Sequence, residues 1–140
     1  MSPLDLCLSL HRAQASLRLK LDDELGTLHG MGWDAFGLLA ALDDAGGAMP
    51  LADLRSRVGV PASGVVRMLL PLEKVGLVAR ESLPGGQRAV RLRRAGRRLL
   101  GEARETASAV CSAALPDGWP LAGAGEFLLG LARSPALELR

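Results

Sequence analysis

Aromatic residues are scarce in this sequence of 140 residues, which contains no tyrosine, two phenylalanines and two tryptophans. Surfaces that bind RNA or single-stranded DNA usually stack bases on several aromatic rings, so this composition argues against such a surface. Cysteine and histidine are equally rare. Cys7 and Cys111 form no CxxC motif, and His11 and His29 have no partner at metal-ligand spacing. We therefore expect neither a disulfide framework nor a metal site, and the sequence indicates no cofactor.

Long apolar runs are also missing. A membrane span needs roughly 20 apolar residues, and no run in the sequence approaches that length. The first ten residues, MSPLDLCLSL, contain Asp5 and no basic region, unlike a signal peptide. We expect a cytoplasmic protein without a membrane partner. With 49% hydrophobic and 23% charged residues, the chain is predicted to fold as one domain with a substantial core.

Charges of opposite sign are separated along the chain, although the formal net charge is only +2. Residues 1–54 carry three Lys or Arg against eight Asp or Glu, whereas residues 55–104 carry twelve Lys or Arg against three Glu. Residues 105–140 carry two Arg against four acidic residues. Because a basic strip on an otherwise neutral body attracts phosphate locally, this separation indicates a surface that binds a polyanion.

Hydrophobic spacing predicts a mainly helical chain with one β-hairpin. A long first helix begins with Ser2 as N-cap and Pro3 at its first position, and a glycine-containing break follows at 26–32. Residues 22–24, all acidic, are expected to form a solvated helix end. The later elements are predicted to be a helix over 33–45, two short helices over 51–58 and 61–74, a hairpin over 77–93, a long helix over 94–115 and a short helix within 119–133.

The two short helices have the pattern of a helix-turn-helix, because Gly59 ends the first and Pro61 opens the second after a tight turn. Pro71 lies inside the second helix, where it removes a backbone hydrogen bond. We expect a bend there that turns Leu72 and Val75 into the core.

A recognition helix places its N-terminal residues against base edges in the major groove of DNA. Four residues of the second helix are predicted to point away from the core: Ser63, Gly64, Val66 and Arg67. Arg67 can bind a guanine bidentately or hold a phosphate, and Val66 can contact a thymine methyl group. The alternatives are a turn or capping role for Ser63 and partial burial for Val66.

Four arginines lie at positions 88–94, directly after the turn Pro84-Gly85-Gly86. Arg88 is next to the turn, where it could enter a narrow minor groove. Arg91 and Arg93 alternate along one strand and Arg80 lies on the partner strand, where all three would contact phosphates. Arg94, Arg97 and Arg98 begin the next helix, where cations oppose the helix dipole, so they suggest an external anion. The alternative is an arginine surface that only aids solubility.

PLADLRSRVGVPASGVVRMLLPLEKVGLVARE, with the arginine-bearing hairpin and RRAGRRLL after it, resembles the winged-helix core of the MarR family of bacterial transcriptional regulators. The resemblance covers nearly the whole chain. It implies a mainly α fold with a small β-hairpin wing, in a single domain over residues 1–140. The winged helix-turn-helix lobe would occupy 33–94, and dimerisation helices would occupy 1–30 and 95–140.

The same resemblance implies a homodimer that binds a pseudo-palindromic duplex, acts as a repressor and responds to a small-molecule effector. The sequence departs from the family pattern at Gly86 or Gln87, where an acidic residue usually accompanies the wing-tip arginine. It also departs at Gly64 and Val66, which occupy positions that are commonly hydroxylic.

Dimerisation also follows from the surface of the first helix, which is apolar on more than one face. For an effector, the residues to consider are His11, Arg12, His29 and Trp33, although Trp33 could equally begin a helix or fill the core. No motif of an enzyme is present. The alternative function is a dimeric winged-helix module that binds a protein, or binds DNA without operator specificity.

Overall fold

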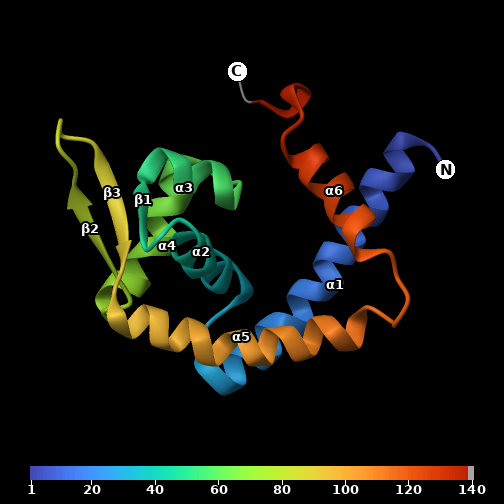
Figure 1. Cartoon of the computed structure of the whole chain (residues 1–140), viewed down its shortest axis with the longest axis horizontal. Coiled ribbons are helices and arrows are strands. Elements are labelled where there is room, and N and C mark those ends of the chain that lie inside the picture. Colours follow the sequence, from blue (N-terminus) through green and yellow to red (C-terminus); the bar gives the residue numbers. More distant parts are fainter. Residues whose placement is uncertain (139–140) are drawn as a thin grey trace. The chain divides into compact units, whose positions relative to one another are not determined.

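The computed structural model describes residues 1–138, which form six α-helices, three β-strands and one 3₁₀ turn (Figure 1). The elements are α1 (Pro3–His29), α2 (Trp33–Asp44), β1 (Ala48–Pro50), α3 (Leu51–Val58), α4 (Ala62–Lys74), β2 (Val78–Ser82), β3 (Arg88–Leu92), α5 (Arg94–Ala114), α6 (Leu121–Ala132) and η1 (Pro135–Leu137). The chain divides into two compact units, the first over residues 1–110 and the second from residue 111 onward. The predicted mainly helical fold with a hairpin wing is confirmed.

Helix α1 begins as the sequence predicts. Ser2 Oγ accepts a hydrogen bond from Asp5 N at 3.1 Å, and Asp5 Oδ2 accepts one from Ser2 N at 3.0 Å, which completes a capping box. The predicted break after residue 25 is wrong, because α1 continues through Gly26 and ends only at Gly30, whose φ of 67° is left-handed. A single glycine costs a helix about 1 kcal/mol, which is too little to end it.

A carboxylate of α1 caps the N-terminus of α2. Asp22 Oδ1 accepts a hydrogen bond from Trp33 N at 2.7 Å. A Cβ added to Gly32 would lie 3.2 Å from the same oxygen, so glycine leaves room for this approach. The expectation that residues 22–24 are only a solvated helix end is therefore wrong for Asp22. The cap joins residues eleven positions apart, so no local pattern reveals it.

Replacing Asp22 with alanine is expected to destabilise the protein by about 1 kcal/mol, because the first N–H of α2 loses its acceptor. The matched control is Asp23→Ala, since Asp23 makes no side-chain hydrogen bond or ion pair within residues 1–138. Urea unfolding followed by circular dichroism measures both variants. Equal free energies of unfolding for the two would show that the cap does not contribute.

The three strands form one antiparallel sheet in the order β1-β3-β2. Residues that face each other across the strands, such as Val78 with Leu92 and Arg80 with Val90, share a face of the sheet. Val78, Val90 and Leu92 are buried and pack toward α2, α3 and α4. The sequence does not predict β1, which has only three residues. Its Pro50 is tolerated because β1 is an edge strand.

Helix α4 contains Pro71 within its last turn. Leu72 is buried as predicted, but Val75 is 67% exposed, so its predicted place in the core is wrong. The reason is that α4 ends at Lys74. Val75 is the C-cap residue and no longer follows the inward spacing of the helix.

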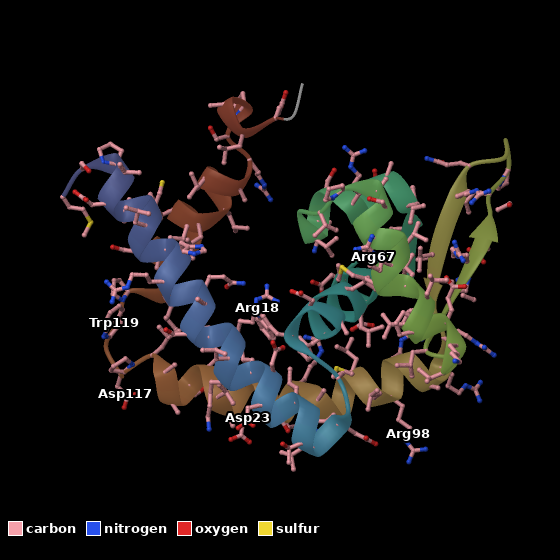
Figure 2. All side chains as sticks on the ribbon, turned by 180° about the vertical axis from the view of Figure 1, so that it is seen from behind. Arg18, Asp23, Arg67, Arg98, Asp117 and Trp119 are labelled. Carbon is pink, nitrogen blue, oxygen red and sulfur yellow. The ribbon has the colours of Figure 1, made fainter. Side chains whose placement is uncertain are left out.

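The second unit contains the end of α5, the short helix α6 and the turn η1. Trp119 and Asp117 lie in the segment between α5 and α6 (Figure 2). Within residues 111–138 no residue is buried. The larger exposed apolar side chains there are Leu115, Trp119, Leu121, Phe127, Leu128, Leu129 and Leu137.

The N-terminal part of α1 is similarly exposed, since the only residues that α1 buries are Leu21 and Leu25. Its exposed leucines are Leu4, Leu6, Leu8, Leu10, Leu19 and Leu28. None of the helices within residues 1–138 combines the length and apolar character that crossing a bilayer requires.

Candidate nucleic-acid interface

The turn between α3 and α4 is tight. Gly59 ends α3 with a left-handed φ of 67°, and Pro61 is the N-cap residue of α4. A Cβ added to Gly64 would lie 3.3 Å from Val60 Cβ, so glycine at this position lets α4 approach the turn closely. A larger side chain at position 64 would require Val60 to shift slightly.

The outer side of α4 carries the predicted recognition residues. Ser63 and Arg67 are exposed and Val66 is half-buried. Val65 and Leu69 are fully buried on the opposite side and fix the helix against the core. Figure 2 shows Arg67 on α4. Arg67 makes no ion pair within residues 1–138.

The β2–β3 hairpin forms the wing and ends in a glycine turn. Leu83 N donates to Gln87 O at 2.7 Å, and Gly86 N donates to Leu83 O at 3.0 Å. Gly85 and Gly86 have φ values of 89° and 82°, a conformation that other residues rarely adopt. The turn therefore favours glycine at position 86, which with Gln87 is one of the two positions where the resemblance would place an acidic residue. In Figure 1 this turn lies at the same side of the first unit as α3.

Arg88 begins β3, directly after the turn, and is exposed. It faces Ser82 across the hairpin and shares its face of the sheet with Arg80 and the buried Val90. Arg88 has no ion-pair partner in the described part of the chain. Its charge is therefore free to meet an external anion.

Arg91 lies on the opposite face of the wing and is already neutralised. Its Nε donates to Glu81 Oε2 at 3.0 Å, and its Nη2 donates to Glu81 Oε1 at 2.9 Å. These bonds lower the pKa of Glu81 below its ordinary value and raise the pKa of Arg91. Arg91 would have to release Glu81 before it could hold a phosphate.

Arg80 is paired as well, because its Nε lies 2.6 Å from Glu73 Oε1 on α4. The contact is an ion pair rather than an aligned hydrogen bond, since Glu73 Oε1 has no hydrogen-bond partner among the described residues. Arg93 lies just beyond β3, at the end of the hairpin away from the turn. The geometry therefore favours Arg67 and Arg88, together with Ser63, as DNA contacts. All eight predicted positions stay predictions in that role.

The predicted effector residues do not form one site. His29 Nε2 lies 2.7 Å from Thr106 Oγ1 on α5. Trp33 begins α2, and its ring stacks on Phe36 with a centroid separation of 5.3 Å. His11 and Arg12 are exposed on α1, and the helical rise puts His11 about 27 Å from His29 along the axis. A role for these residues in effector binding stays a prediction.

The arginines that begin α5 differ in their partners. Arg97 Nε lies 3.5 Å from Asp43 Oδ1 on α2, and Arg104 Nη2 lies 3.3 Å from Asp43 Oδ2. Arg97 is therefore partly neutralised within the chain, and its role toward an external anion stays a prediction. Asp43 and Arg97 are far apart in the sequence, so only the folded chain brings them together. Arg94 has no carboxylate partner within residues 1–138.

Known proteins resemble this chain in part of its sequence and in most of its fold. The model of the IclR helix-turn-helix domain matches residues 35–82, which run from α2 to the end of β2. No curated protein matches the sequence.

Several solved structures match the fold over nearly the whole chain. A MarR-family transcriptional regulator from Rhodococcus sp. RHA1 has a TM-score of 0.84 at 18% identity and covers 92% of this chain and 93% of its own. Sco3205 from Streptomyces coelicolor, a MarR-family regulator solved in complex with DNA, has a TM-score of 0.83 at 22% identity, with coverages of 96% and 89%. CouR from Rhodococcus jostii RHA1, solved with p-coumaroyl-CoA, has a TM-score of 0.82 at 18% identity, with coverages of 95% and 95%. The chain therefore has the winged helix-turn-helix fold of the MarR-family transcriptional regulators.

Proposed function

We propose that this protein is a transcriptional regulator of the MarR type, without enzymatic activity, that binds duplex DNA as a homodimer. The observation that carries the proposal is the placement of two unpaired guanidinium groups on a winged helix. Arg67 lies on the exposed side of α4, and Arg88 lies beside the wing turn. Neither has an intramolecular ion pair within residues 1–138.

The two arginines suit different parts of a duplex. Helix α4 enters the major groove, where Arg67 binds a guanine edge or a phosphate and Ser63 adds a hydroxyl. The wing lies along the backbone, and Arg88 reaches the minor groove, whose negative potential attracts guanidinium groups. Because neither arginine must give up a carboxylate, DNA binding costs no existing ion pair at these positions.

The exposed apolar surfaces support a second copy as the partner of this chain. The leucines of α1 and the apolar side chains of residues 111–138 would be an aggregation hazard on a monomer. A two-fold pair covers such surfaces and presents two α4 helices to the two halves of a palindrome. Linking two half-sites also raises the effective concentration of the second contact, so weak individual contacts suffice.

We also propose that the homodimer acts as a repressor whose operator affinity is lowered by a small-molecule effector. The support is a likeness of fold to CouR, which was solved bound to p-coumaroyl-CoA. His29 and Trp33, which lie near the junction of α1 and α2, are the first positions at which to test effector binding.

Replacing Arg88 with alanine is expected to weaken duplex binding and to flatten its dependence on salt. The negative slope of log K against log salt should become shallower by about 0.9 for each wing whose arginine engages the duplex, because one fewer counterion is released. Fluorescence anisotropy with a labelled duplex at several salt concentrations gives this slope. The control is Arg133→Ala, which removes an exposed arginine of the second unit. Equal changes in the two variants would contradict the assignment of the wing to DNA.

A further inference from the structure

One carboxylate of α2 holds two arginines of α5. Asp43 Oδ1 lies 3.5 Å from Arg97 Nε, and Asp43 Oδ2 accepts a hydrogen bond from Arg104 Nη2 at 3.3 Å. The two arginines are about two helical turns apart, so both lie on one side of α5. We call these three side chains the Asp43 clamp. Figure 1 shows α5 beginning at the end of the hairpin opposite to the turn and passing α2.

The surroundings of the Asp43 clamp leave room for it. Leu100 lies between the two arginines on the same side of α5 and is buried. A Cβ added to Gly47 would lie 2.9 Å from Arg97 Nη2, so glycine lets this guanidinium lie against the turn after α2. Gly47 O accepts a hydrogen bond from Leu92 N at 2.6 Å, which joins the same turn to β3. The clamp therefore connects α5 to the point where α2 leads into the sheet.

The Asp43 clamp joins two parts of the chain that have different roles in the proposed dimer. Helix α2 belongs to the winged helix, where it packs against α3, β1 and β3. Helix α5 continues into the second unit, whose exposed apolar side chains we assign to the dimer contact. Helix α2 is also joined to α1, since Arg18 Nη1 lies 2.7 Å from Asp34 Oδ1. The winged helix is thus tied to both helices of the proposed dimer contact.

The clamp is better suited to setting an orientation than to stabilising the fold. Its side chains are 35%, 57% and 45% exposed for Asp43, Arg97 and Arg104, and exposed ion pairs contribute little to stability. Within residues 1–138 the backbone of α5 does not follow that of α2 closely over a long stretch, so side chains set their relative position. Both carboxylate oxygens are held, which fixes a direction better than one contact does.

We propose that Asp43 is a positioning residue, which fixes the angle between the winged helix and α5 and thereby the separation of the two α4 helices in the homodimer. The inference rests on the proposed function, since this separation matters only to a dimer that binds two half-sites. One added base pair moves the half-sites about 3.4 Å apart and rotates them by about 35°. A firmly held dimer therefore binds one spacing well, and a loosened clamp makes neighbouring spacings acceptable.

Asp43→Asn tests the inference, because it keeps the shape of the side chain and removes its charge. The probes are the inverted repeat enriched from random duplexes and two duplexes whose spacer is one base pair longer or shorter. The parent should prefer the enriched spacing at least about tenfold, because a wrong spacing disengages one half-site. Asp43→Asn should lower this preference about three- to fivefold, the factor that corresponds to losing an exposed ion-pair network.

Fluorescence anisotropy at one salt concentration gives the affinity of each variant for each duplex. The preference is a ratio of two affinities of the same protein sample. A smaller fraction of folded protein lowers both affinities by the same factor, so a loss of stability alone leaves the ratio unchanged.

Asp44→Asn is the matched control. Asp44 is the next residue of α2, and its Oδ2 lies 3.8 Å from Arg57 Nη2 on α3, so this pair stays inside the winged helix. Both substitutions remove one negative charge from each chain, so a general electrostatic effect on DNA binding is shared. Asp44→Asn should keep the spacing preference. Equal losses in the two variants, or an unchanged preference in Asp43→Asn, would overturn the inference.

Arg104→Gln breaks the clamp from α5. It should also lower the spacing preference, and the double variant should match Asp43→Asn, because both changes act on one contact. Additive losses would contradict the inference. A parent that binds all three spacings equally would overturn it and leave DNA binding intact. A parent that binds no duplex would contradict the proposed function itself, and the inference with it.

Discussion

Replacing Gly96 with alanine is expected to destabilise the folded protein by about 3 kcal/mol, the upper part of the range for overpacking a core. Gly96 is buried in the first turns of α5. An added Cβ would collide with Leu77 O and would lie 2.7 Å from Leu92 Cδ1. The oxygen cannot withdraw cheaply, because it also accepts the hydrogen bond from Arg93 N. Urea unfolding measures the loss.

Gly101→Ala is the matched control for this prediction. Gly101 lies in the same helix and is exposed, and an added Cβ there would meet nothing within 4 Å. Alanine is the better helix former, so this variant should be more stable than the parent by about 0.5–1 kcal/mol. The two substitutions are chemically identical, and opposite signs are expected. Similar changes in both would show that α5 does not press against the start of β2.

Replacing Arg67 with alanine is expected to have the largest effect on DNA binding. A bidentate contact to a base contributes about 1–3 kcal/mol, and a symmetric dimer loses it twice. Affinity for the operator should therefore fall by about 30-fold or more. Affinity for an unrelated duplex should fall less, because non-specific binding rests on many phosphate contacts. Anisotropy titrations of the two duplexes at one salt concentration give the affinity for the operator and the affinity for the unrelated duplex.

Arg67→Lys separates the two roles open to this residue. Lysine keeps the charge but lacks the planar fork that binds two acceptors of a guanine. If Arg67 binds a guanine, the lysine variant should lose specificity almost as fully as the alanine variant. If Arg67 holds a phosphate, lysine should restore most of the affinity. Unchanged binding by the alanine variant would exclude α4 as the recognition helix.

Much of the fold could be predicted from sequence because its helix ends have local causes. Ser2 and Asp5 form a capping box three residues apart, and Gly59 marks the end of α3 with a left-handed φ. The strand β1 could not be predicted in this way. Its three residues are too few to show the alternation of apolar and polar residues that marks a strand. The strand forms because it pairs with β3, which is distant in the sequence. The cap that Asp22 provides for α2 likewise depends on two helices meeting.

The sequence was enough to predict which residue types make up the candidate site. It was not enough to predict which of its arginines form ion pairs with carboxylates. Sequence places Arg91 in a basic hairpin, whereas the structure joins it to Glu81. That contact depends on the hairpin register, which sets Ala79 opposite Arg91 and brings Glu81 within diagonal reach. Ion pairs between strands, or between a strand and a helix, depend on strand register and packing, which the amino-acid composition does not reveal. Such pairs decide which arginines keep an unpaired charge.

The most direct test of the central claim is a selection from random duplexes with the purified full chain. A homodimer that presents two α4 helices should enrich an inverted repeat, with half-sites about one helical turn apart or a multiple of that spacing. The Arg67→Ala variant should fail to enrich it. Retention of duplexes without any enriched sequence would indicate binding without operator specificity. Failure to retain duplexes at all would contradict DNA binding and favour a protein partner for the wing.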